Sequence, residues 1–244
     1  MKVIRIFLAI LLAMGVPSAQ AATTKTISFT AEVWADNWFA LYVNGKKVAE
    51  DSVSITTQKS FNSEVIKFSA TYPLTIGFIA KDYVQSKSGL EYLGQPNQQI
   101  GDGGIIFQIK ESVSGKLVTV SDETWKMRVA NTAPLNPECE KSNQPDLDCK
   151  FSNFTIPTNW ASASFSDKLW ASSKVFSATQ VGPKDGYLQI TWNAAAKFIW
   201  GNDLKLDNTV YFRKKVSAPV ANSVTASFDF TVTSATGSNL NIDT

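Results

Sequence analysis

Apolar and polar residues alternate along most of this chain after its first twenty positions. Six stretches place an apolar group at every second residue, which is the period of a β-strand with one buried face. They cover residues 27–33, 66–70, 74–80, 105–109, 188–192 and 224–232. The intervening positions are mostly Ser, Thr, Lys and Gln, as expected where the other face meets water.

Short turn signals separate these stretches, among them Asn44-Gly45, Ser114-Gly115 and Asp185-Gly186. After residue 21, no window of helical length shows the 3.6-residue period of an amphipathic helix. The pattern therefore predicts an all-β fold, an antiparallel β-sandwich. Trp34 has the opposite parity to Val33, so we expect it to point outward unless a second layer covers it.

The stretch 130–158 interrupts the alternation and contains four of the nine prolines and both cysteines. Cys139 and Cys149 are ten positions apart, and in an exported protein such a pair favours a disulfide that closes a surface loop. A metal site built on these two thiols would lack two further ligands. We therefore predict a disulfide-tied loop insertion at 130–158 within a domain that spans 22–217.

The N-terminus has the three parts of a secretory signal peptide. A basic stretch with Lys2 and Arg5 precedes an apolar run over 6–16, and an A-x-A cleavage site ends at Ala21. The apolar run is shorter than the ~20 residues that span a bilayer, and no later stretch is longer. We expect residues 1–21 to be removed, giving a secreted or periplasmic protein without membrane insertion.

Charge and composition exclude several classes of function. Without Lys2 and Arg5, 21 of the 23 basic residues remain against 21 acidic ones, so no basic surface predicts a nucleic-acid partner. Histidine is absent, which excludes Ser-His-Asp and Cys-His nucleophile pairs and His-ligated metals. We predict no cofactor.

The C-terminal region matches an earlier part of the chain. Residues 28–45 align without a gap on 227–244, with strand parity preserved. Segment 218–244 is therefore predicted to be a partial repeat or an extra strand, with an unpaired edge. That edge would pair with the first module or with another copy of the chain, so self-association is one interpretation.

Four local patterns occur in order between residues 27 and 216. They are ADNWFALYVNGK at 35–46, SDETWK at 121–126, Trp160 with FSDKLW at 165–170, and FIWG at 198–201 with VYFRK at 210–214. Together they resemble the galactose-binding-like jelly-roll modules that are appended to glycoside hydrolases such as α-L-rhamnosidases. The resemblance implies a jelly roll without catalytic activity of its own, since the catalytic modules of that family are separate domains. A tryptophan side chain buries a large surface area when it packs in a core. We therefore expect core positions for the matched tryptophans Trp125, Trp170 and Trp200, and also for Trp192.

Candidate ligand contacts combine aromatic rings with carboxylate and amide groups, the mixture that binds sugars. Asp36, Asn37 and Trp38 lie together at the head of the 35–46 hairpin. Tyr83, Glu91 and Tyr92 flank a polar loop that can face the same end. In the structural alternative, Asp36 and Asn37 cap a turn by accepting hydrogen bonds from backbone amides.

Three classes of function follow. The first is a non-enzymatic module that binds carbohydrate weakly, and the second is a structural or matrix protein that assembles through 218–244. A glycosidase, the third, needs two carboxylates ~5–9.5 Å apart, which no sequence pattern here places. Related jelly rolls also hold calcium, for which Asp36, Asp102, Asp146 and Asp148 offer oxygens without the spacing of a dedicated loop.

Overall fold

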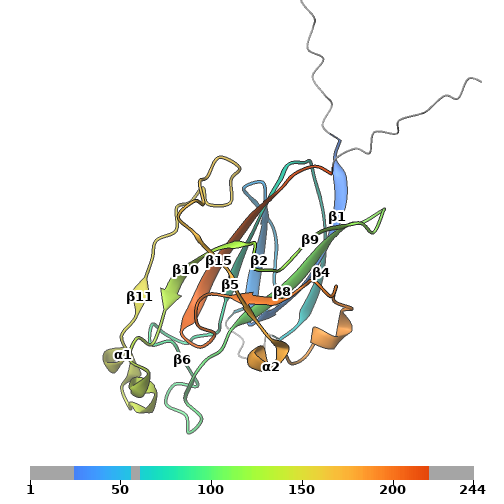
Figure 1. Cartoon of the computed structure of the whole chain (residues 1–244). Coiled ribbons are helices and arrows are strands. Elements are labelled where there is room, and N and C mark those ends of the chain that lie inside the picture. The colour runs from blue at the N-terminus through green and yellow to red at the C-terminus, as the bar shows by residue number, and fades with distance from the viewer. Residues whose placement is uncertain (1–24, 56–60, 220–244) are drawn as a thin grey trace, which may run out of the picture.

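The computed structural model describes residues 25–55 and 61–219, which form an antiparallel β-sandwich (Figure 1). The predicted leader at 1–21 and the predicted strand at 224–232 lie outside these residues. In the described part of the chain, no helix combines the length and apolar character needed to cross a membrane. The all-β fold predicted from the alternation is confirmed.

The first sheet has the strand order β13-β14-β8-β1-β4, and β9 pairs with β8. Its strands are β1 (Ile27–Asp36), β4 (Ser63–Ala70), β8 (Gly104–Glu111), β9 (Leu117–Val120), β13 (Lys174–Phe176) and β14 (Phe198–Trp200). Three predicted alternating stretches lie in β1, β4 and β8. Phe29, Ala31 and Val33 of β1 are fully buried against the other sheet, as their parity predicts.

The second sheet has the order β11-β10-β15-β5-β2-β3, and β12 pairs with β10. Its strands are β2 (Trp38–Val43), β3 (Lys46–Glu50), β5 (Leu74–Lys81), β10 (Lys126–Thr132), β11 (Ser152–Asn153), β12 (Ala171–Ser172) and β15 (Asp207–Val216). Leu74, Ile76 and Phe78 of β5 are fully buried and complete the core between the sheets.

Helices are short and lie in the connections. They are η1 (Pro137–Lys141), α1 (Pro145–Asp148), α2 (Ala178–Val181) and η2 (Tyr187–Gln189). The prediction of a strand at 188–192 was wrong, because Gly186 adopts a left-handed φ of 82° and its carbonyl accepts a hydrogen bond from the Gln189 amide at 3.0 Å. The turn places Leu188 in solvent and packs Ile190 inward.

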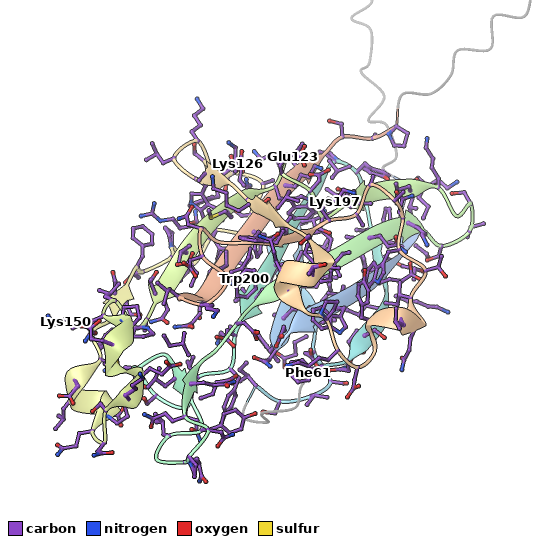
Figure 2. All side chains as sticks on the ribbon, turned by 60° about the horizontal axis from the view of Figure 1, so that its bottom comes forward. Phe61, Glu123, Lys126, Lys150, Lys197 and Trp200 are labelled. Carbon is purple, nitrogen blue, oxygen red and sulfur yellow. A yellow bond between two sulfur atoms is a disulfide. The ribbon has the colours of Figure 1, made fainter. Side chains whose placement is uncertain are left out.

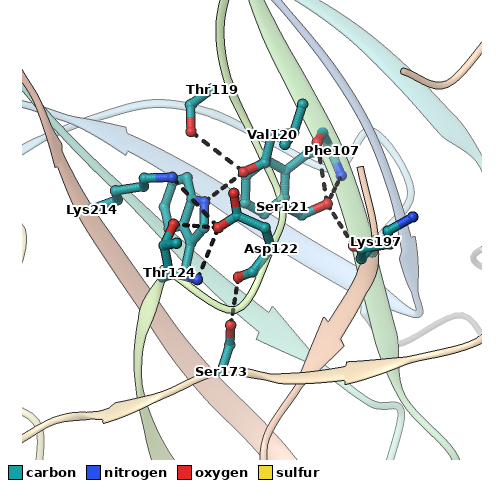
Figure 3. Close-up of polar contacts among 10 residues, drawn as sticks. Phe107, Thr119, Val120, Ser121, Asp122, Thr124, Ser173, Lys197 and Lys214 are labelled. Carbon is teal, nitrogen blue, oxygen red and sulfur yellow. Dashed lines mark hydrogen bonds and ion pairs between the residues drawn. The ribbon is translucent and has the colours of Figure 1, made fainter. Parts of the chain in front are cut away.

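The segment with the SDETWK pattern closes one part of the core (Figure 3). Ser121 Oγ accepts from the Phe107 amide at 3.0 Å and donates to the Lys197 carbonyl at 2.7 Å. The indole of Trp125 is fully buried and donates to the Val120 carbonyl at 2.7 Å. These residues therefore hold strands together. Of the other tryptophans predicted to lie in the core, Trp200 is fully buried and Trp170 is buried, whereas Trp192 is only half-buried.

A second layer covers the outer face of each sheet. Trp34 points outward from β1 but is fully buried, because the segment after α2 folds back over it and the Asp185 carbonyl accepts from its indole at 2.9 Å. On the other sheet, Trp160 packs on Tyr42 and Tyr211 with ring centroids about 5 Å apart. Trp34 therefore projects from the outer face of its sheet, as its parity predicts. A second layer covers it there, which is the exception that the prediction allowed.

The predicted disulfide is present, with a Cα–Cα distance of 5.3 Å between Cys139 and Cys149. The two cysteines pack against Leu90, so the insertion contacts the hairpin formed by β6 (Leu90–Glu91) and β7 (Gln99–Ile100). Figure 1 shows β6, α1 and α2 at the same end of the sandwich. Lys150 lies out at the disulfide loop, whereas Trp200 lies within the body of the domain (Figure 2).

Candidate functional site

Strand pairing brings chemically active side chains together at this end of the sandwich. The register of β1 with β8 places Asp36 opposite Gly104, next to Asp102. The register of β2 with β5 places Trp38 opposite Lys81, the residue before Asp82. The ends of β1, β2, β5 and β8 that carry these residues therefore lie close together at this end of the sandwich. The β6–β7 hairpin lies in the connection between β5 and β8.

A pocket of about 390 Å³ opens there, within the roughly 300–1,000 Å³ of small-molecule sites. Its lining combines two aromatic rings, three carboxylates, an amide and an ammonium group. The residues are Phe61, Glu91, Tyr92, Gln99, Asp102, Lys184 and Asp185. Phe61 lies at the edge of the domain in Figure 2. The pocket thus offers hydrogen-bonding groups together with apolar faces.

Asp82 is a deeply buried acid near the pocket, with 2% of its surface exposed. Neither of its carboxyl oxygens has a side-chain hydrogen-bond partner among the described residues. One of them packs so closely on Gly101 that a Cβ there would lie 2.3 Å away, so a larger residue at position 101 would displace the Asp82 carboxyl. Burial raises the pKa of Asp82 well above its ordinary value, and the negative charges of Glu91, Asp36 and Asp102 raise it further.

Asp36 has the same character, being 2% exposed with one oxygen unpartnered. Burial raises its pKa well above the ordinary value, followed by the charge of Asp102, while Lys184 acts in the opposite direction. Burial also raises the pKa of Glu91, which the hydrogen bond from Gln99 partly offsets. The site is therefore a set of carboxyl groups that resist ionisation, next to a single ammonium group.

The hairpin that carries the lining residues is held by the disulfide loop. Gln99 Nε2 donates to Glu91 Oε2 at 2.9 Å across the hairpin. The Ile100 amide donates to Glu140 Oε1 at 2.9 Å, and Gln98 Nε2 donates to the Glu140 carbonyl at 2.6 Å. The disulfide between residues 139 and 149 thereby constrains the wall of the pocket.

The predicted ligand residues occupy different positions. Glu91 and Tyr92 line the pocket, and Asp36 lies next to it. Asn37 is buried, and its side-chain oxygen accepts from the amide of the buried Tyr83 at 2.5 Å, which is the capping role of the structural alternative. Trp38 is half-buried beneath the Lys81 ammonium, 5.2 Å from its ring centroid, and is not part of the pocket lining. Its role in binding stays a prediction.

Sequence reasoning missed four members of the lining, which are Phe61, Gln99, Lys184 and Asp185. Lys184 and Asp185 lie more than eighty residues beyond Asp102, and only the layer that folds back over Trp34 brings them to the pocket. The available signal was the polar run Gly182-Pro-Lys-Asp-Gly186 between two glycines, which marks a loop. Gln99 belongs to a polar stretch without any distinctive pattern.

Of the oxygens considered for calcium, only those of Asp36 and Asp102 meet at this site. Asp146 and Asp148 belong to α1 of the disulfide loop, where Asp148 accepts a hydrogen bond from Ser142. Within residues 25–55 and 61–219, no three His, Cys, Asp or Glu side chains form a group that could hold a metal ion.

Comparison with protein-family models, with curated proteins and with solved structures gives no match to this chain.

Proposed function

We propose that this protein is an exported module that binds carbohydrate and has no catalytic activity of its own. The observation that carries the proposal is the composition of the pocket, where the rings of Phe61 and Tyr92 accompany the amide of Gln99 and the carboxylates of Glu91 and Asp102. Aromatic faces pack on sugar C–H groups, while carboxylates and amides hydrogen-bond hydroxyls. The disulfide and the signal-peptide pattern support export.

The sequence patterns shared with galactose-binding-like modules support the same proposal, since carbohydrate is a ligand class of that superfamily. The pocket is open and holds few ligand groups, so the affinity should be modest. A pre-formed wall, fixed by the hydrogen bonds of Gln98 and Ile100 to the disulfide loop, reduces the entropy lost on binding.

Glycan-array screening, followed by titration calorimetry with the best ligand, tests the proposal. Gln99→Ala should weaken binding at least about tenfold, because it removes hydrogen-bonding groups from the pocket. Gln95→Ala is the matched control, since Gln95 is an exposed amide on the same hairpin outside the pocket lining. Retention after Gln99→Ala together with loss after Trp38→Ala would move the site to the hairpin head.

A glycosidase is a second candidate, because the pocket brings Glu91 and Asp102 together and the pKa of Glu91 is raised, as a general acid requires. We favour binding, because the hydrogen bond from Gln99 Nε2 stabilises the ionised form of Glu91. Incubation with the array ligands and chromatography of the products separates the two candidates. Cleavage that Glu91→Gln abolishes would establish the enzyme.

A further inference from the structure

Carboxyl groups outnumber ammonium groups in and around the pocket. Five carboxyl groups lie in or next to it, those of Asp36, Asp82, Glu91, Asp102 and Asp185. Lys184 supplies the one ammonium group of the lining. Its Nζ lies over the Phe61 ring, 4.4 Å from the centroid, and forms no ion pair with a described residue. Within the lining, three carboxyl groups therefore accompany one ammonium group.

The buried carboxyl group of Asp82 lacks a side-chain partner, which suggests that a ligand supplies the positive charge. Buried carboxyl groups in proteins are normally hydrogen-bonded or paired, because desolvation without compensation is costly. Both oxygens of Asp82 and one of Asp36 lack a side-chain partner among the described residues, and the Tyr83 amide acts to lower the pKa of Asp82. The charges of Glu91 and Asp102, which line the pocket, raise the pKa of Asp82. A cation in the pocket would stabilise the ionised form of these groups.

Two features distinguish an organic cation from a metal ion. No three carboxylates of the described residues converge as a metal centre. The lining also includes the aromatic rings of Phe61 and Tyr92, whose faces attract an ammonium group. An ammonium carries three N–H donors and no acceptor, which suits a wall of carboxylate acceptors.

We propose that the ligand of this pocket is positively charged, with an ammonium group such as the free amine of an amino sugar held by Glu91 and Asp102. This inference rests on the proposed carbohydrate function and names its ligand class. The free amine should be preferred over its N-acetyl form by at least about tenfold, because acetylation removes the charge and all but one of the N–H donors.

The experiment compares three sugars that differ only at one carbon: glucosamine, N-acetylglucosamine and glucose, with galactosamine and its counterparts as a second series. Amide chemical shifts of the ¹⁵N-labelled protein report binding at a pH where the amine is protonated. Asp102→Asn and Glu91→Gln should each lower the affinity for the amine about tenfold and lower that for the neutral sugars less, because the new amide removes the charge but still hydrogen-bonds hydroxyls. Asp146→Asn, on α1 outside the pocket, removes the same charge as a matched control.

Equal affinity for the amine and its N-acetyl form would overturn the inference and leave the carbohydrate proposal intact. Binding of calcium chloride alone, lost in Asp102→Asn, would overturn it in favour of an inorganic cation. Absence of any shift with either amine would overturn it as well, while the glycan array decides the carbohydrate proposal separately.

Discussion

The ion pair between Arg213 and Asp167 allows a sharp test of how the outer layer is held on the second sheet. Arg213 lies on β15 with its side chain fully buried, and its guanidinium donates to Asp167 and, at 2.6 Å, to the Ser162 carbonyl. Both partners belong to the segment that covers this face. Asp167→Ala leaves a buried cation with no opposite charge, a change that typically costs 3–5 kcal/mol.

The structure favours the lower end of this range. Asp167 keeps 25% of its side chain in solvent, so water can partly replace the lost carboxylate. We therefore expect Asp167→Ala to lower the free energy of unfolding by about 3 kcal/mol. The control is Glu50→Ala, which breaks the exposed pair with Lys47 and should leave the free energy of unfolding nearly unchanged.

Urea unfolding followed by tryptophan fluorescence measures both variants. Adding Arg213→Met to Asp167→Ala should recover part of the loss, because the double variant no longer buries an unpaired charge. An Asp167→Ala midpoint equal to that of Glu50→Ala would refute the reasoning. It would mean that Arg213 reaches water and that the covering segment is loosely held.

Three further predictions follow from the same structure. Trp125→Ala should destabilise by roughly 3–5 kcal/mol, since the ring is fully buried, and an unchanged urea midpoint would contradict this. Burial raises the pKa of Asp51 from 3.8 to about 6. The folded state therefore favours the protonated carboxyl, and its contribution to the free energy of unfolding is fully present below pH 3.8 and is lost as the pH rises through 6. Asp51→Asn should therefore stabilise the protein above pH 7 but not in acid, and an equal gain at both pH values would contradict the raised pKa. Replacing Cys139 and Cys149 by serine should speed hydrogen exchange in the 90–100 hairpin and weaken ligand binding more than it lowers the melting temperature.

The strands of the core were predictable, because one face of each is buried and the parity of Phe29 or Ile76 records that face directly. The covering layers were not. The stretch 188–192 has strand-like alternation, yet it forms a 3₁₀ turn because it packs on the outside of the sheet rather than within it. Parity cannot distinguish these two environments, and only the outward position of Trp34 indicated that a layer existed.

The place of the candidate pocket could be predicted in part, where its residues lie at strand ends. Asp36 was identified from its place at the head of the hairpin, and Glu91 and Tyr92 from the polar loop. Lys184 was not, because its position depends on a long connection that returns to the far side of β1. Asn37 was assigned to the ligand as well, whereas its amide oxygen is used to fix the backbone at Tyr83.

The central claim is that ligand binds in the pocket between the β6–β7 hairpin and the 182–186 turn. Chemical-shift mapping with the best glycan-array ligand tests it most directly. The account predicts the largest amide shifts at Glu91, Gln99, Asp102 and Lys184, with little change at Trp38. Shifts confined to Trp38 and Lys81, or to a face away from this end of the sandwich, would contradict it.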